Sequence, residues 1–219
     1  MTSANAVPPG RVIVLNGSSS AGKTTLAQAL QVNLEGAWQH MALDHFRDGM
    51  SPRYRGLNSP AGTPGAAGLN VVPIDMGGER VTSIQFGEQG QRVLRGMHRA
   101  IAAFALAGND VIVDDLIWDQ PTLDDYLDAL LDLHVWFVGV RCSRSVVEAR
   151  EAQRAGRFPG TATSHFDSVH AWCRYDLEVD TSEQTPAECA VLVRECLARP
   201  AEAHRQMLEA RRSGTLFAG

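Results

Sequence analysis

Residues 17–24, Gly-Ser-Ser-Ser-Ala-Gly-Lys-Thr, match the pattern G-x-x-x-x-G-K-[ST] without deviation. Glycines let the backbone curl around phosphates, so that successive N–H groups and the N-terminus of the following helix face the anion. Lys23 would bridge the β- and γ-phosphates of a nucleoside triphosphate, and Thr24 would place its hydroxyl on Mg²⁺. Lys23 is also the only lysine in the chain, which argues against a chance match. The predicted nucleotide-binding residues are Gly17, Ser18, Ser19, Ser20, Ala21, Gly22, Lys23, Thr24 and Thr25.

Two adjacent carboxylates, Asp114 and Asp115, follow the apolar run Val111-Ile112-Val113. An acidic residue at the end of such a strand usually holds Mg²⁺, directly or through water, in phosphate-loop proteins. Thr24, Asp114 and Asp115 are therefore the predicted metal-binding residues. Neighbouring strand residues point to opposite faces, so we expect only one aspartate to face the metal. The alternative is a solvated strand end.

Asp44 closes another predicted strand, and the carboxyl ends of parallel strands line the ligand crevice. A carboxylate there would accept the proton of an acceptor hydroxyl as that oxygen attacks the γ-phosphorus. We therefore predict Asp44 as the catalytic base, with His45 as a flanking contact. The alternative is that Asp44, which precedes Phe46, is the N-cap of a helix.

Arginines would stabilise the charge on the transferred phosphoryl group, and Arg150, Arg154 and Arg157 lie on or just beyond one predicted helix. Arg150 and Arg154 share a helix face. Gly and Pro residues then break the helix, as expected of a closing lid over residues 150–165. These three arginines complete the predicted catalytic set with Lys23 and Asp44. The alternative is a solvated charged face.

The elements that must position these residues alternate between strand and helix, which predicts one α/β domain over residues 11–198. We expect residues 1–10 to form a disordered lead and residues 199–219 to form a C-terminal helix and tail. Predicted strands cover residues 11–16, 39–44, 110–115, 134–140 and 176–180, and predicted helices cover 22–34, 88–107, 122–132, 143–155 and 185–198.

Residues 49–78 are rich in Pro, Gly, Ser and Asn and show little periodicity. Irregular segments of this length are uncommon in compact domains unless they serve a function or are disordered. The two interpretations left open are an acceptor-binding flap and a mobile insertion.

The net charge of -5 argues against a nucleic-acid partner, which would require clustered Lys and Arg. We find neither a basic-then-apolar leader nor an apolar run long enough to span a membrane, so we expect a cytoplasmic protein without a membrane partner. The four cysteines lack zinc-site spacing and are expected to be reduced.

Taken together, these residues resemble the chloramphenicol phosphotransferase family. The matching segments are Leu15 to Lys23, Leu43-Asp44, Ile112 to Asp115, Trp136 to Cys142, the three arginines and Tyr175 to Thr181. The resemblance implies an α/β, three-layer P-loop kinase fold with a five-stranded parallel sheet in the order 2-3-1-4-5 and a small lid. It also implies a Mg²⁺-bound ATP or GTP donor, Asp44 as base, and an antibiotic as the small-molecule acceptor, phosphorylated for self-resistance.

The insertion at residues 49–78 falls where such an enzyme holds its acceptor, so we expect a bulkier acceptor than chloramphenicol, such as a nucleoside or glycosylated antibiotic. One alternative is a metabolic kinase for a nucleoside or shikimate-like acceptor. Another is a nucleotide-binding switch module, but the usual guanine motif N-K-x-D cannot occur in a chain whose only lysine is Lys23. The oligomeric state stays open.

Overall fold

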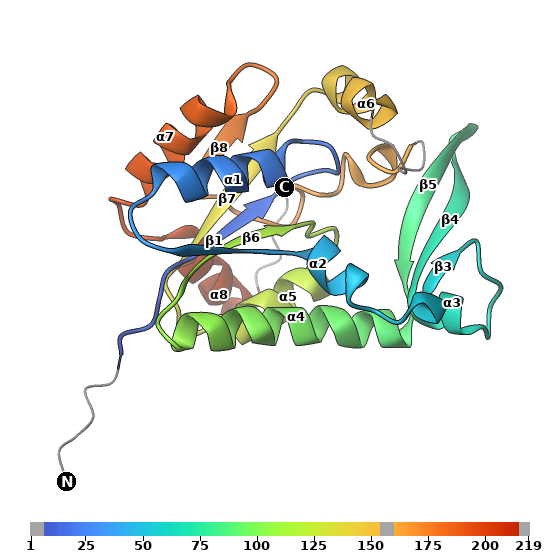
Figure 1. Cartoon of the computed structure of the whole chain (residues 1–219), viewed down its shortest axis with the longest axis horizontal. Coiled ribbons are helices and arrows are strands. Elements are labelled where there is room, and N and C mark those ends of the chain that lie inside the picture. Colours follow the sequence, from blue (N-terminus) through green and yellow to red (C-terminus); the bar gives the residue numbers. More distant parts are fainter. Residues whose placement is uncertain (1–6, 154–159, 215–219) are drawn as a thin grey trace, which may run out of the picture.

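Five parallel strands form the central sheet in the computed structural model, which describes residues 7–153 and 160–214 (Figure 1). Their order, β2-β6-β1-β7-β8, is the predicted 2-3-1-4-5 when the five strands are counted along the chain. The three inner strands contain runs of consecutive apolar residues because helices cover both faces of the sheet. The predicted fold class is confirmed. The strands are β1 (Val12–Asn16), β2 (Trp38–Ala42), β6 (Asp110–Asp115), β7 (Val135–Arg141) and β8 (Leu177–Asp180).

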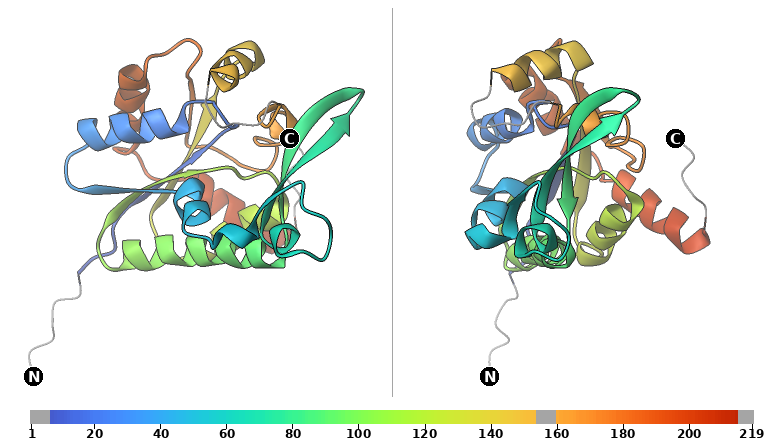
Figure 2. Two further views of the ribbon diagram at one scale, coloured as in Figure 1. Left: turned by 45° about the vertical axis from the view of Figure 1, so that its right-hand side comes forward. Right: turned by 90° about the vertical axis from the view of Figure 1, so that its right-hand side faces the viewer.

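Helices lie in two layers, one on each face of the sheet, as Figure 2 shows from two further directions. The first layer packs on Ile13 and Leu15, and the second packs on Val12, Val14 and Phe137. None of the helices in the described ranges is long and apolar enough to cross a membrane. The first layer contains α1 (Lys23–Asn33) and α7 (Pro186–Cys196), the second contains α4 (Glu88–Leu106), α5 (Gln120–Ala129) and α8 (Ala203–Ser213), and α6 (Arg144–Ala152) follows β7.

A second sheet, of three strands, stands beside the end of α4 (Figure 1). It contains β3 (Arg55–Leu57), β4 (Leu69–Met76) and β5 (Glu79–Phe86), with β4 and β5 antiparallel. Gly77 and Gly78 join β4 to β5 with φ values of 63° and 89°, the left-handed conformations that a tight hairpin turn of this type requires.

The structure thus folds much of residues 49–78, for which we expected little regular structure. Besides β3 and β4, the segment contains the 3₁₀ helix η1 (Pro52–Tyr54) and the short helix α3 (Pro64–Ala67). The Gly-Gly pair between two apolar alternating runs is a hairpin signal that the sequence analysis did not use.

Several predicted boundaries shift by a few residues. Strand β2 ends at Ala42, so Leu43 and Asp44 begin helix α2 (Leu43–Asp48) rather than close the strand. The imidazole Nδ1 of His45 accepts a hydrogen bond from the Ala42 N–H at 3.2 Å, which satisfies a donor at the start of this helix.

The chain is anchored before the first strand, since the Gly10 N–H donates to the Ala105 carbonyl at 2.8 Å. The predicted disordered lead therefore does not extend to residue 10, and residues 1–6 lie outside the described residues. At the other end, α8 is the predicted C-terminal helix, and its His204 ring stacks against Phe137 of β7.

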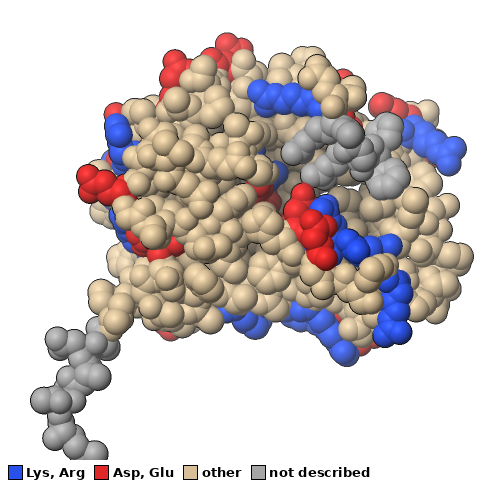
Figure 3. All heavy atoms as spheres, in the orientation of Figure 1, with Lys and Arg blue, Asp and Glu red and all other residues tan. Residues whose placement is uncertain are grey.

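Charged side chains of both signs form small scattered groups on the face shown in Figure 3, with wide uncharged areas between them. This pattern fits the small net charge of -5 for 219 residues.

Candidate active site

The phosphate loop, residues 17–22, connects β1 to α1 and bends through two left-handed residues. Ser20 has φ 62° and Gly22 has φ 94°. A Cβ atom at Gly17 would lie 2.4 Å from the Val140 carbonyl oxygen, so only glycine lets the loop pass this close to β7. The Lys23 ammonium donates to the carbonyl oxygens of Gly17 and Ser18, both at 2.9 Å. These contacts curl the loop around the lysine.

Thr24 and Asp114 face each other across the start of α1 and the end of β6. The Thr24 hydroxyl donates to Asp114 Oδ2 at 2.6 Å, and the Lys23 ammonium lies 3.9 Å from Asp114 Oδ1. Burial would raise the pKa of Asp114, but neighbouring His40, Lys23 and Thr24 outweigh it and lower the pKa. The carboxylate is therefore ionised. An ionised carboxylate and a hydroxyl are suitable oxygen ligands for Mg²⁺, which completes its shell with phosphates and water.

Asp115 makes its contacts on the other side of β6. Its carboxylate accepts a hydrogen bond from the Tyr126 hydroxyl, and its Oδ2 lies 3.8 Å from Nε2 of the buried His98. His98 Nδ1 in turn lies 2.5 Å from Asp125 Oδ2. Asp115 also borders the cavity described below, and its Oδ1 has no hydrogen-bond partner among the described residues. Of the two predicted metal-binding aspartates, Asp114 is the one that contacts Lys23 and Thr24.

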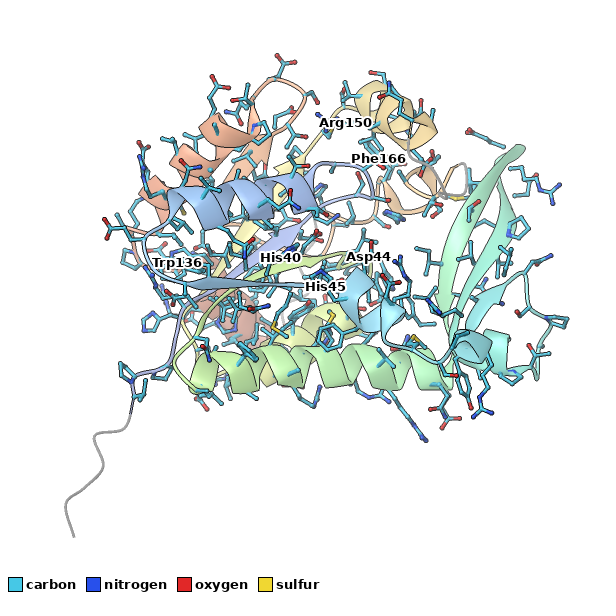
Figure 4. All side chains as sticks on the ribbon, in the orientation of Figure 1. His40, Asp44, His45, Trp136, Arg150 and Phe166 are labelled. Atoms are coloured by element: carbon cyan, nitrogen blue, oxygen red, sulfur yellow. The ribbon has the colours of Figure 1, made fainter. Side chains whose placement is uncertain are left out.

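Asp44 lies in the first turn of α2, at the carboxyl end of β2. Its side chain is 46% exposed, and its Oδ1 accepts a hydrogen bond from Arg47 Nη1 at 2.7 Å. Asp44, His45 and His40 lie close together in Figure 4, beside the carboxyl ends of β2 and β6. Asp44 therefore lines the cavity with a partly exposed carboxylate.

Arg150 lies at a different part of the site from Asp44 (Figure 4). Its guanidinium donates to the Thr181 hydroxyl at 3.0 Å and the Thr181 carbonyl at 2.8 Å. The Thr181 hydroxyl donates to the Ala21 carbonyl at 2.6 Å, which ties Arg150 to the phosphate loop. Arg154 and Arg157, with the rest of residues 154–159 of the predicted lid, lie outside the described residues.

One cavity of about 820 Å³ joins the phosphate loop to Asp44. At the end nearer α7 it is lined by Arg150, Thr181, Gln184, Pro186 and Cys189.

The opposite end of the cavity has an apolar wall that sequence reasoning missed. Ser83, Ile84 and Phe86 of β5 line it together with Leu116 and Trp118, which follow β6. The Phe86 and Trp118 rings stack with centroids 5.0 Å apart and planes 6° from parallel. Trp118 could have been found, because an aromatic residue just beyond the carboxyl end of a central strand lies where ligands bind. The β5 residues follow the predicted insertion, and none of the cavity-lining residues falls within 49–78.

Residues 10–198 match the family described as chloramphenicol phosphotransferase-like protein. The chain belongs to this family. A relative named "Putative O-phosphotransferase" from two strains of Mycobacterium tuberculosis is 33% identical over 192 residues, covering 84% of this chain and 80% of that protein.

Solved structures share the fold at low sequence identity. The Mycobacterium tuberculosis APS kinase CysC, in complex with AMPPNP and APS, has a TM-score of 0.61 at 16% identity, covering 88% of this chain and 99% of that one. The tunicamycin resistance protein of Deinococcus radiodurans has a TM-score of 0.54 at 16% identity, covering 86% and 95%. The family match, the O-phosphotransferase relative and the phosphate loop identify this member of the chloramphenicol phosphotransferase-like family as a P-loop phosphotransferase, and the solved kinases show that it shares their fold.

Proposed function

We propose that this phosphotransferase moves the γ-phosphoryl group of ATP or GTP onto a hydroxyl of an uncharged antibiotic that carries an aromatic or apolar ring. The apolar wall opposite the phosphate loop is the observation that carries this proposal. The antibiotic assignment is supported by the family description and by the resistance protein that shares the fold.

At the donor end, the phosphate-loop N–H groups and Lys23 would bind the triphosphate, and Thr24 and Asp114 would hold Mg²⁺. Bound Mg²⁺ neutralises charge on the β- and γ-phosphates. Arg150 is tied through Thr181 to the phosphate loop, so we assign it to the bound nucleotide. Arg154 and Arg157 remain the arginines proposed for the transferred group.

At the acceptor end, Asp44 would orient the hydroxyl and take its proton. The acceptor oxygen attacks the γ-phosphorus and forms a new P–O bond, while the bond to the β,γ-bridging oxygen breaks and the nucleoside diphosphate leaves. The proton passes to the Asp44 carboxylate, which water then deprotonates. Its 46% exposure gives Asp44 the access that both transfers require.

The wall favours an uncharged acceptor with a ring. Phe86 and Trp118 offer flat apolar surfaces on which a ring can stack, and Ile84 and Leu116 extend them. A carboxylate or phosphate on the acceptor would require cationic partners, and the described residues of this wall include neither Lys nor Arg. This argues against a shikimate-like acceptor.

The test is mass spectrometry of hydroxylated compounds incubated with the protein, Mg²⁺ and ATP or GTP. The panel pairs chloramphenicol and larger nucleoside or glycosylated antibiotics with carboxylate-bearing metabolites. We expect a phosphate-sized mass gain on an uncharged antibiotic that is lost with Asp44→Asn. Turnover of the carboxylates alone would favour the metabolic alternative. Chloramphenicol outcompeting every larger compound would contradict the bulkier acceptor that the sequence predicts.

A further inference from the structure

One peptide unit of the phosphate loop contacts two side chains at opposite ends. The carbonyl of Ser18 accepts a hydrogen bond from the Lys23 ammonium at 2.9 Å. The N–H of Ser19, in the same peptide unit, donates to Nε2 of His165 at 3.1 Å. The amide therefore links the only lysine in the chain to a histidine that the sequence analysis did not single out.

His165 is held as a neutral acceptor. Because Nε2 accepts from Ser19, the ring proton must lie on Nδ1, and the Ser164 hydroxyl is 3.3 Å from Nδ1. Burial, with the positive charge of Lys23, lowers the pKa of His165 to about 3. The ring therefore keeps its acceptor at Nε2 throughout the neutral range.

The segment that carries His165 is fixed to both helix α6 and the second sheet. His165 ends the 3₁₀ helix η2 (Thr163–His165). Just before it, the N–H groups of Gly160 and Ala162 donate to the buried Glu151 carboxylate of α6 at 2.8 and 2.9 Å. The Gly160 carbonyl accepts from the Thr82 N–H of β5 at 3.4 Å. These contacts give the His165 ring a defined position against the phosphate loop.

We propose that His165 is a positioning residue for the donor site, which holds the Ser18–Ser19 peptide with its carbonyl toward Lys23. Hydrogen bonds at the two ends of one amide polarise it and strengthen each other. Without an acceptor, the buried Ser19 N–H would be unsatisfied and the peptide free to turn its carbonyl away from the ammonium. This role of His165 concerns the donor site alone and does not depend on the identity of the acceptor.

Three substitutions of His165 distinguish the contribution of its hydrogen-bond acceptor from the contribution of its ring volume. His165→Gln places an amide oxygen near the position of Nε2, His165→Asn carries the same amide but is too short, and His165→Phe keeps a ring without an acceptor. His134→Gln, at an exposed histidine on the opposite end of the sheet, is the matched control.

Calorimetry would measure binding of Mg²⁺ with AMPPNP, and with the corresponding guanine analogue, in the absence of any acceptor. We expect His165→Phe and His165→Asn to weaken binding about tenfold, as for a lost hydrogen bond that leaves a buried donor unpaired. The Gln variant and the control should stay within about threefold of the wild type. NMR correlation of the wild-type ring should show a proton on Nδ1 and a bare Nε2.

Wild-type affinity in the Phe variant, or equal weakening in the Gln and Asn variants, would overturn the proposal. A proton found on Nε2 would do the same. If the Phe variant does not fold, the comparison of Gln with Asn decides, because both are polar and differ in reach. Since no acceptor is present, a failed acceptor panel leaves this result intact, whereas a wild type that binds neither analogue would refute the donor site itself.

Discussion

The Thr24 hydroxyl and the Asp114 carboxylate lie 2.6 Å apart, although 90 residues separate them in the chain. Parallel pairing of β1 with β6 places Leu15 opposite Asp114, which brings the end of β6 beside the start of α1. Two oxygen ligands of the kind that Mg²⁺ prefers thus meet next to Lys23.

Replacing Asp114 and Asp115 one at a time by asparagine should separate the effect on metal binding from the effect on stability. We expect Asp114→Asn to raise the Mg²⁺ concentration for half-maximal activity at least about tenfold, since the metal loses a charged ligand. Asp115→Asn should leave this requirement near that of the wild type and lower the melting temperature, because it weakens the contacts with Tyr126 and His98. Metal titration and thermal unfolding of both variants measure this, and the reverse pattern would assign the metal to Asp115.

Lys23→Ala should abolish phosphate transfer and leave the fold intact, because the lost ammonium carries the charge that the β- and γ-phosphates require. Activity assays would measure the loss of phosphate transfer, and circular dichroism would measure whether the fold is intact. The chain offers a second test, since Lys23 is its only lysine. An amine-specific reagent should modify Lys23 and the chain's terminal amine alone, and saturating nucleotide should protect Lys23. Labelling of Lys23 at the same rate with and without nucleotide would argue against its role.

Asp44→Asn should retain nucleotide binding and reduce transfer by a factor of about 10²–10⁴, the usual contribution of a general base. Asp48→Asn is the matched control, because Asp48 also pairs with Arg47, at 2.8 Å, but does not line the cavity. Steady-state turnover with calorimetric nucleotide binding makes the comparison. Equal losses in both variants would point to the Arg47 ion pairs rather than to proton transfer.

Trp118→Ala should raise the KM for the acceptor about tenfold and leave the KM for nucleotide unchanged, since a stacking surface is removed at the acceptor end alone. The Trp118 carbonyl accepts from Trp172 Nε1 at 3.0 Å, so its backbone stays anchored when the side chain is shortened. Phe104→Ala, at a 43% exposed aromatic residue of α4, is the control. Kinetics in which the nucleotide KM rises instead would place Trp118 at the donor end.

Stability should fall as the pH rises above neutral, because of His98. Burial disfavours its charged form, but Asp115 and Asp125 outweigh burial and raise the pKa of His98 above 6.5. A raised pKa gives stability that is fully present below pH 6.5 and is lost as the pH rises through the folded-state pKa. Burial instead lowers the pKa of His165 and His170 to about 3 and that of His204 to about 4, so these three are already neutral in this range.

Thermal unfolding between pH 6 and pH 9 would measure the effect. We expect the melting temperature of the wild type to decrease by about 2–4 °C for each kcal/mol of lost stability. His98→Gln should unfold at lower temperature at pH 6 and show a flatter profile. Parallel profiles for the two proteins would show that His98 does not change charge in this range.

Local patterns in the sequence were sufficient to predict the phosphate loop, the alternating elements and the α/β class. The motif at residues 17–24 lies between an apolar strand and a helix, and this context is local. The sheet order followed from the family resemblance, and the structure confirms it. The hairpin of β4 and β5 is predictable from Gly77-Gly78, but the predicted irregular insertion at residues 49–78 contained β4 and left β5 unassigned.

The rest of the site depends on contacts between distant segments. The sequence predicted Asp44 at a strand end and Arg150 on a helix, but only the folded structure decided that Asp44 lies in the first turn of α2 and that Arg150 pairs with Thr181. The apolar wall joins Phe86 of β5 to Trp118, which follows β6, and the Ser19–His165 hydrogen bond spans 146 residues. Periodicity tells which face of an element is buried. It does not tell which distant side chain meets that face, because that is fixed only when the sheet and its helices pack together.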